Sequence, residues 1–153
     1  MAHEEADTLL IDKLRERRQR VTSQRLVIFR AVHARRQHLT AEQVLDAVSP
    51  ALPGIAMPTV YATLLLLEEL DLVRRVSTGT GAVLFDSRVT PHAHTVCRGC
   101  GALGDLEAPG APPEALQCAS DAGFSPDHAQ LLIWGLCAAC KTPAAAAAAP
   151  PAV

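Results

Sequence analysis

Residues Asp86–Asp105 read DSRVTPHAHTVCRGCGALGD, and most of the chemistry of this 153-residue chain lies in this stretch. His92 and His94 are two positions apart, and residues i and i+2 of an extended strand face the same side. Cys97 and Cys100 follow in CxxC spacing, and an aspartate stands at each end of the stretch. We therefore expect two neighbouring metal sites, one of imidazoles and carboxylates and one of thiolates.

A second CxxC pair, Cys137 and Cys140, supplies two further thiols. Four thiolates satisfy tetrahedral Zn²⁺, and each CxxC turn can donate two of them. A dithiol redox pair is the alternative, although a thioredoxin-like motif needs only one CxxC. The fifth cysteine, Cys118, has no CxxC partner and is expected to be a buried free thiol.

The composition indicates a globular chain, with 20% charged and 49% hydrophobic residues. No apolar run approaches the roughly 18 residues that span a bilayer. The first ten residues are acidic and lack the basic region and cleavage site of a signal peptide. We therefore expect a cytoplasmic protein with no membrane segment, in which paired cysteines bind metal or act in redox chemistry rather than form disulfides.

The net charge of −2 conceals a basic segment. Nine basic residues and one acidic residue lie between Lys13 and Arg36, whereas two basic and five acidic residues lie from Cys97 onward. Such a segment favours phosphate binding, and the alternative is a solvated helix face. The candidate DNA-binding residues within it are Arg15, Arg17, Arg18 and Arg20.

The first part of the chain has the element order of a winged helix-turn-helix. The patterns predict four helices: residues 8–18, a second helix capped by Thr22, a third that starts at the capping box Thr40–Gln43 and ends near Ser49-Pro50, and residues 58–71. A hairpin follows, with strands 73–77 and 82–87 around Gly79-Thr80-Gly81. The helix before the hairpin enters the major groove in that architecture.

Helix 58–71 therefore supplies further candidate DNA-binding residues, Thr59, Tyr61 and Thr63. Their hydroxyl groups suit phosphates, and small side chains there suit thymine methyls better than guanine edges. The alternative is a plain buried helix, since its leucines are expected in the core: Leu65, Leu66, Leu67 and Leu70.

The second part of the chain mixes strands and one helix around the cysteine turns. The patterns predict strands 93–97, 102–107 and 129–136, a helix 113–123, and an Ala/Pro-rich tail that is disordered. We therefore expect an α+β fold, with a winged helix-turn-helix DNA-binding domain at 1–88, a small α/β metal-binding domain at 89–141, and a tail at 142–153.

Three imidazoles and two carboxylates remain as candidate ligands for a second metal. They form a harder donor set than four thiolates, and they suit Fe²⁺ or Mn²⁺ better than structural zinc. The candidate ligands are His38, Asp86, His92, His94 and Asp105. By itself, His38 would more often be a surface histidine near a helix cap than a metal ligand.

These motifs together resemble the ferric uptake regulator (Fur) superfamily, over about residues 14–140. The chain is most similar to the peroxide-sensing repressor (PerR) branch and its actinobacterial catalase-regulator relatives. The matching segments are Arg20–Arg25, His38–Glu42, Pro58–Tyr61, His92–Gly101 and Trp134–Cys140.

The resemblance implies a homodimeric repressor that binds double-stranded operator DNA and is not an enzyme. It also implies that the domain at 89–141 is the dimerisation domain. It implies structural zinc on the four paired cysteines and a regulatory Fe²⁺ or Mn²⁺ site on His38, Asp86, His92, His94 and Asp105. The expected function is hydrogen peroxide sensing and control of oxidative-stress genes such as catalase. The alternative is a metal-uptake regulator for iron, zinc, nickel or manganese.

Several positions depart from the superfamily pattern. Many relatives have an acidic residue where this chain has Ala93, and some have histidine at Leu136, which argues against a third metal site. Iron-sensing members more often carry glutamate where this chain has Asp86 and Asp105, which favours peroxide sensing. Arg18 replaces a common glycine, so the entry to the DNA-binding helix is expected to differ.

Other classes explain fewer of these residues. The zinc deaminase pattern needs HxE before its cysteines, and position 94 here is histidine with no glutamate beside it. A zinc-ribbon interaction module would account for the cysteines but not for His38, the aspartates or the basic segment. An RNA reader would need stacking aromatics, and only 3% of the residues are aromatic.

Overall fold

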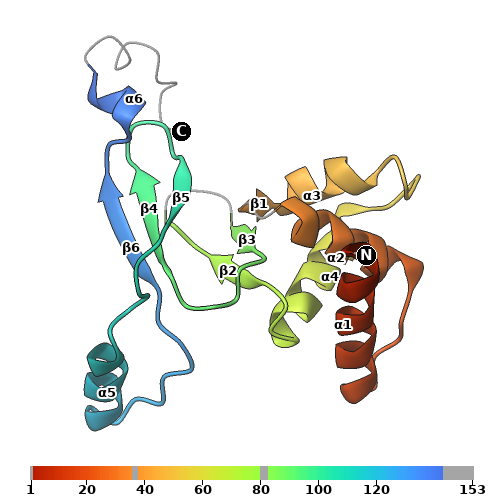
Figure 1. The fold of residues 1–153 in the computed structure, drawn as a ribbon, viewed down its shortest axis with the longest axis horizontal. Coiled ribbons are helices and arrows are strands. Elements are labelled where there is room, and N and C mark those ends of the chain that lie inside the picture. Colours follow the sequence, from red (N-terminus) through yellow and green to blue (C-terminus); the bar gives the residue numbers. More distant parts are fainter. Residues whose placement is uncertain (1, 36–37, 80–82, 143–153) are drawn as a thin grey trace. The chain divides into compact units, whose positions relative to one another are not determined.

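The computed structural model describes residues 2–35, 38–79 and 83–142 (Figure 1). The chain divides between Val89 and Thr90 into two compact units, called here the N-terminal and C-terminal units, and the boundary expected from sequence lies one residue earlier. Across these described ranges, no helix combines the length and the apolar character that crossing a bilayer requires.

Four helices make up most of the N-terminal unit: α1 (Ala2–Glu16), α2 (Ser23–Arg35), α3 (Ala41–Val48) and α4 (Met57–Glu69). The Arg25 N–H donates to Thr22 Oγ1 over 3.4 Å at the start of α2. At the start of α3, Gln43 N–H donates to Thr40 Oγ1 (3.2 Å) and Thr40 N–H donates to Gln43 Oε1 (2.9 Å), which is the predicted capping box. Pro58 stands in the first turn of α4, where its missing N–H costs nothing.

The four helices bury their apolar faces in one core. Its largest fully buried side chains from the helices are Leu10, Leu14, Ile28, Phe29, Val32, Val44, Val48, Val60, Leu64 and Leu67. Leu67 and Leu70 are buried as predicted, and the half-buried Leu66 packs against the core. The prediction for Leu65 was wrong, because it is only half-buried and is not among the residues packed against the core. The buried face of α4 follows positions 60, 64 and 67, the spacing of one helical face, and position 65 lies off it.

A three-stranded sheet completes the N-terminal unit. Its strands are β1 (Leu39–Thr40), β2 (Arg74–Val76) and β3 (Leu84–Asp86), in the order β1-β3-β2 with both pairs antiparallel. The β2–β3 pair is the predicted hairpin, although residues 80–82 of its turn lie outside the described ranges. Strand β1 was missed, because two residues are too few to show alternation.

The C-terminal unit is built on a second three-stranded sheet. Its elements are β4 (Ala93–Cys97), β5 (Leu103–Leu106), α5 (Pro113–Asp121), β6 (Leu131–Gly135) and α6 (Ala138–Lys141). Strand β4 is central, antiparallel to β5 and parallel to β6. A parallel pair needs a long crossover, and α5 lies in the connection between β5 and β6. The α+β prediction is therefore confirmed, while the tail from residue 143 lies outside the described ranges.

The first helix is longer toward the N-terminus than predicted. It begins at Ala2 rather than at residue 8, with Glu4 and Glu5 in its first turn, where the helix dipole favours negative charge. Ala6, Leu10 and Leu14 recur at four-residue spacing and are all buried. This spacing was the signal for the longer helix.

The residues that follow α1 form a left-handed helix end. Arg18 has φ 53°, Gln19 N–H donates to Leu14 O over 2.7 Å, and Arg18 N–H donates to Arg15 O over 2.9 Å. This is the Schellman arrangement, which normally places glycine at the left-handed position. The chain therefore forms this left-handed helix end with arginine at position 18, where superfamily members commonly have glycine.

We predict that Arg18→Gly raises the free energy of unfolding by about 0.5 to 1 kcal/mol, because glycine relieves the left-handed strain at that position. Urea unfolding of the two proteins measures this difference. Arg17→Gly is the matched control and should destabilise, since φ at position 17 is not positive. Equal destabilisation by both glycines would contradict the argument.

Candidate functional site

The four paired cysteines converge at one end of the second sheet. Cys97 ends β4, and Cys100 lies in the tight turn that follows. Cys137 caps the start of the short helix α6, and Cys140 lies within it. Strand pairing explains the convergence, since Cys97 is in register with Gly135, two residues before Cys137. All four Sγ atoms lie within 4.8 Å of one another, and Cys100 Sγ is 3.9 Å from Cys137 Sγ.

These sulfur positions fit a tetrahedral zinc ion. Zn–S bonds of about 2.3 Å place the four sulfurs roughly 3.8 Å apart. The turn is built for close approach, because a Cβ at Gly99 would come within 3.0 Å of Cys140 Cβ and Sγ. Glycine at 99 therefore lets the two cysteine turns pack against each other.

The electrostatics of the thiols also favour a cation among them. The backbone N–H of Cys137 donates to Cys97 Sγ over 3.3 Å, and this bond is the main reason that the pKa of Cys97 falls to about 6. The neighbouring Cys137 thiol, followed by Cys97 and Cys100, raises the pKa of Cys140 to about 12. Four thiolates this close repel one another unless a metal neutralises them, so the donor set fits Zn²⁺.

Three further candidate ligands lie together at the other end of β4. His92 and His94 have ring centroids 4.3 Å apart, and His94 is in register with Asp105 on β5. His92 Nε2 is 3.2 Å and His94 Nε2 3.7 Å from the same oxygen, Asp105 Oδ1. Both imidazoles are buried, whereas the aspartate side chain is 32% exposed.

A backbone contact orients the His92 ring toward this group. Its Nδ1 lies 2.8 Å from Thr90 O, and a carbonyl only accepts, so Nδ1 carries the proton. In a neutral ring, His92 Nε2 then carries a lone pair, and this lone pair faces Asp105 Oδ1. Two such acceptors need a proton or a cation between them. The bond from Nδ1–H to a backbone carbonyl is the usual second-shell arrangement of a metal-binding histidine.

The other two candidate ligands lie together in the N-terminal unit. His38 directly precedes β1 and Asp86 ends β3, the strand with which β1 pairs. His38 Nε2 is 3.8 Å from Asp86 Oδ2, with side chains 10% and 3% exposed. The Arg88 N–H donates to Asp86 Oδ1 over 2.8 Å, which orients the carboxylate. We call this pair the His38–Asp86 half-site.

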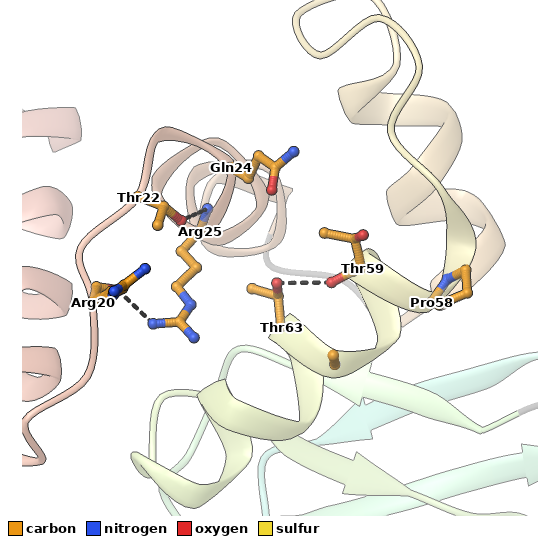
Figure 2. A pocket seen from close by; sticks show the side chains of 8 residues that line it. Arg20, Thr22, Gln24, Arg25, Pro58, Thr59 and Thr63 are labelled. Carbon is orange, nitrogen blue, oxygen red and sulfur yellow. Dashed lines mark hydrogen bonds between the residues drawn. The ribbon is translucent and has the colours of Figure 1, made fainter.

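An open pocket of about 430 Å³ lies between the first turns of α2 and α4 (Figure 2). Its lining side chains are basic, hydroxylic, small or, at Gln24, an amide, and none of the described ones is acidic: Arg20, Thr22, Gln24, Arg25, Pro58, Thr59, Ala62 and Thr63. Arg25 Nη1 donates to the carbonyl oxygen of Arg20, which keeps the two arginines side by side. We call these residues the two-arginine pocket.

The predicted DNA-binding residues occupy different places. Arg20, Thr59 and Thr63 line the pocket, but the buried Thr63 hydroxyl donates to Thr59 O over 2.8 Å. Tyr61 is 37% exposed on α4, and Arg15, Arg17 and Arg18 are exposed outside the pocket lining. Arg25 was counted only as part of the basic segment. Its position three residues after the Thr22 cap was the signal that it would lie near the start of α2.

The prediction for Cys118 was wrong, because this free thiol is exposed on α5. No residue of helix α5 is buried.

Comparison with known proteins gives consistent results. The model of the family described as the ferric uptake regulator family matches residues 16–134. The transcriptional regulator FurA of Mycobacterium tuberculosis (strain ATCC 25618 / H37Rv) is 34% identical over 131 residues, which are 85% of this chain and 88% of that protein. The peroxide operon regulator of Bacillus subtilis (strain 168) is 31% identical over 140 residues, which are 92% of this chain and 95% of that protein. A solved structure of a zinc uptake regulator complexed with zinc and DNA has TM-score 0.69 and 28% identity, and the match covers 92% of this chain and 96% of that one.

We predict that Cys97→Ser lowers the bound zinc and unfolds the C-terminal unit, because structural zinc contributes folding free energy directly. Elemental analysis measures the metal. The single tryptophan, Trp134 on β6, makes fluorescence a probe of this unit alone. Cys118→Ser is the matched control and should leave both readouts unchanged. A Cys97→Ser protein that keeps stoichiometric zinc and a normal unfolding midpoint would contradict the assignment.

Proposed function

Since the chain belongs to the ferric uptake regulator family, and is therefore a metal-responsive transcriptional regulator and not an enzyme, we propose that it is a homodimeric repressor that senses hydrogen peroxide. In this proposal, structural Zn²⁺ is held by the four paired cysteines. A regulatory Fe²⁺ or Mn²⁺ is bound by His38, Asp86, His92, His94 and Asp105. The regulated genes are those of the oxidative-stress response, catalase among them.

The composition of the second ligand group carries the proposal. His92 and His94 share one oxygen of Asp105, and His38 faces Asp86. Two ligands in one unit and three in the other are each too few for a five- or six-coordinate ion, and together they make a complete set. Imidazoles with short carboxylates form a site suited to ferrous iron or manganese.

Such a shared ion would make DNA binding depend on metal. We propose that it couples the two units, which sets the spacing of the two α4 helices in a dimer to one face of an operator. Metal affinity and DNA affinity would then be reciprocally linked. Ferrous iron, when bound, supplies the reducing electron for peroxide. His38 and His92 would then be the ligands that gain oxygen and lose the ability to hold the site closed.

Exposed apolar surface on the C-terminal unit supports a homodimer. Ile133, Trp134 and Leu136 are 45%, 47% and 45% exposed, and no side chain of α5 is buried. A short sheet with this much uncovered apolar surface is the kind of surface that a second copy of the chain would cover.

We propose that the two-arginine pocket binds a backbone phosphate of operator DNA while Tyr61 reaches the bases. Two arginines without an acidic neighbour suit one phosphodiester, and the first turns of α2 and α4 add positive dipole ends. Beyond Arg20, which lies in the pocket, Arg15, Arg17 and Arg18 would extend this contact along the backbone.

A metal-uptake regulator is the second candidate. The relative named FurA and the structure of a zinc uptake regulator support it as directly as the peroxide operon regulator supports the first. The two candidates differ in how the iron form responds to peroxide.

For DNA binding, we predict that Arg25→Gln weakens operator and random duplex about equally and lowers the slope of log K against log salt by about one, because one phosphate contact is lost. Fluorescence anisotropy at several salt concentrations measures this slope. Arg35→Gln, at the exposed end of the same helix, is the matched control and should leave the slope unchanged. An unchanged slope for Arg25→Gln would remove the phosphate assignment.

For sensing, we predict that the iron form loses operator binding at low peroxide and the manganese form does not. The loss should track a gain of one oxygen atom on the peptide carrying His38 or His92, measured by mass spectrometry. His38→Ala should abolish metal-activated binding. Asp105→Glu should keep metal-activated binding but blunt the peroxide response, if carboxylate length governs access to the ion. If both metal forms resist peroxide and neither peptide gains mass, the chain is a metal-uptake regulator.

A further inference from the structure

One row of paired residues crosses the sheet of the N-terminal unit. Leu39 on β1 is in register with Phe85 on β3, and Phe85 is in register with Arg75 on β2. Register partners project from the same face of a sheet. Leu39 and Phe85 both belong to the buried core, so this face of the sheet is turned toward the helices.

The half-site begins one residue further along the same two strands. His38 precedes Leu39 and Asp86 follows Phe85. Successive side chains of a strand point to opposite faces. Strand β3 therefore has a candidate metal ligand on one face and a fully buried aromatic ring on the other.

The row also holds α4 at two points. The Tyr61 and Phe85 rings meet edge to face, with centroids 6.0 Å apart and planes at 86°. Arg75 Nε lies 2.6 Å from Glu68 Oε2. Glu68 is seven residues after Tyr61 and therefore lies on the same face of α4. Two adjacent residues of the sheet thus contact two residues on one stripe of the proposed recognition helix.

We propose that Phe85 is a positioning residue that transmits occupation of the His38–Asp86 half-site to Tyr61 on α4. This inference rests on the proposed function and deepens it, because it adds a route by which metal acts on DNA reading within one unit. It needs no change in how the two units are arranged.

The expected movement is small, but the packed core around Phe85 leaves little room to absorb it. His38 Nε2 and Asp86 Oδ2 are 3.8 Å apart, whereas two ligands that lie beside each other on one ion, with bonds near 2.1 Å, are roughly 3.0 to 3.4 Å apart. Closing this gap moves the ends of β1 and β3. Phe85 is fully buried and tightly packed cores transmit such shifts, so the Tyr61 ring must adjust.

The chain offers a direct probe of this effect. Tyr61 is its only tyrosine, so incorporation of 3-fluorotyrosine gives a ¹⁹F resonance from that ring alone. The experiment adds a second equivalent of diamagnetic Zn²⁺ to full-length, zinc-loaded protein without DNA. Calorimetry measures the affinity for that second ion, and anisotropy separately measures how much the metal increases operator affinity.

We expect the Tyr61 resonance of the wild type to shift on binding of the second ion. Phe85→Leu should bind that ion with unchanged affinity and show no shift. Its metal-dependent gain in operator affinity should fall about 2- to 10-fold, the size of an aromatic pair's contribution. Phe29→Leu is the matched control, because it makes the same change at another buried phenylalanine whose aromatic contact is with His33, and it should keep the full shift.

Other outcomes overturn the inference. A full shift in Phe85→Leu shows that the contact transmits nothing, and loss of metal affinity in that variant shows that Phe85 only supports the half-site. A wild type that binds the second ion without a shift overturns the inference alone, whereas a wild type that binds no second ion overturns the proposed function with it. Phe85→Met provides the same test if the leucine variant does not fold.

Discussion

The parallel pairing of β4 with β6 is the interaction on which the C-terminal unit depends. It joins residues 93–97 to residues 131–135 and brings the two CxxC turns to one end of the sheet. Among its described residues, 90–142, the unit buries little else: the buried side chains are Ala93, Val96 and Cys97 with the two histidines. Closing so long a connection costs conformational entropy that a core this small cannot offset. Zinc on the four thiolates would supply the missing free energy at the end where the strands must stay together.

The same five-residue strand separates two kinds of metal chemistry. Its last residue, Cys97, has a lowered pKa because backbone N–H groups stabilise the thiolate. Its first residues place His94 beside Asp105 and the preceding His92. Soft sulfur donors are thereby kept at one end and hard nitrogen and oxygen donors at the other, so each group favours a different ion. Strand alternation and register are enough to produce this separation.

Local signals predicted most of this fold, and pairing between distant segments explains what they missed. The capping box at Thr40 and Pro58 at the start of α4 act within one turn, so they are visible in the sequence. The CxxC spacing likewise predicted four thiols that do converge. Strand β1 depends on β3, forty-five positions later, and no local pattern shows it. Cys118 is exposed on α5, none of whose residues is buried, and the sequence of that helix alone does not show this. Arg25 was present in the basic segment, but its role depends on the packing of α2 beside α4.

The two metal groups also differ in what folding requires of them. The N-terminal unit has a continuous core from α1 to β3, so the His38–Asp86 half-site is attached to a unit that folds on apolar burial. An ion bound there adds to an existing structure, and its loss would leave the unit folded. The four thiols have no comparable core around them, so removing their ion would remove the C-terminal unit itself. The proposed function uses this difference: one ion would stay for the life of the protein, and the other could leave or be oxidised while the proposed recognition helix remains folded. The aspartate that His92 and His94 share is also about one-third exposed, which gives a small oxidant or an exchanging ion access from solvent.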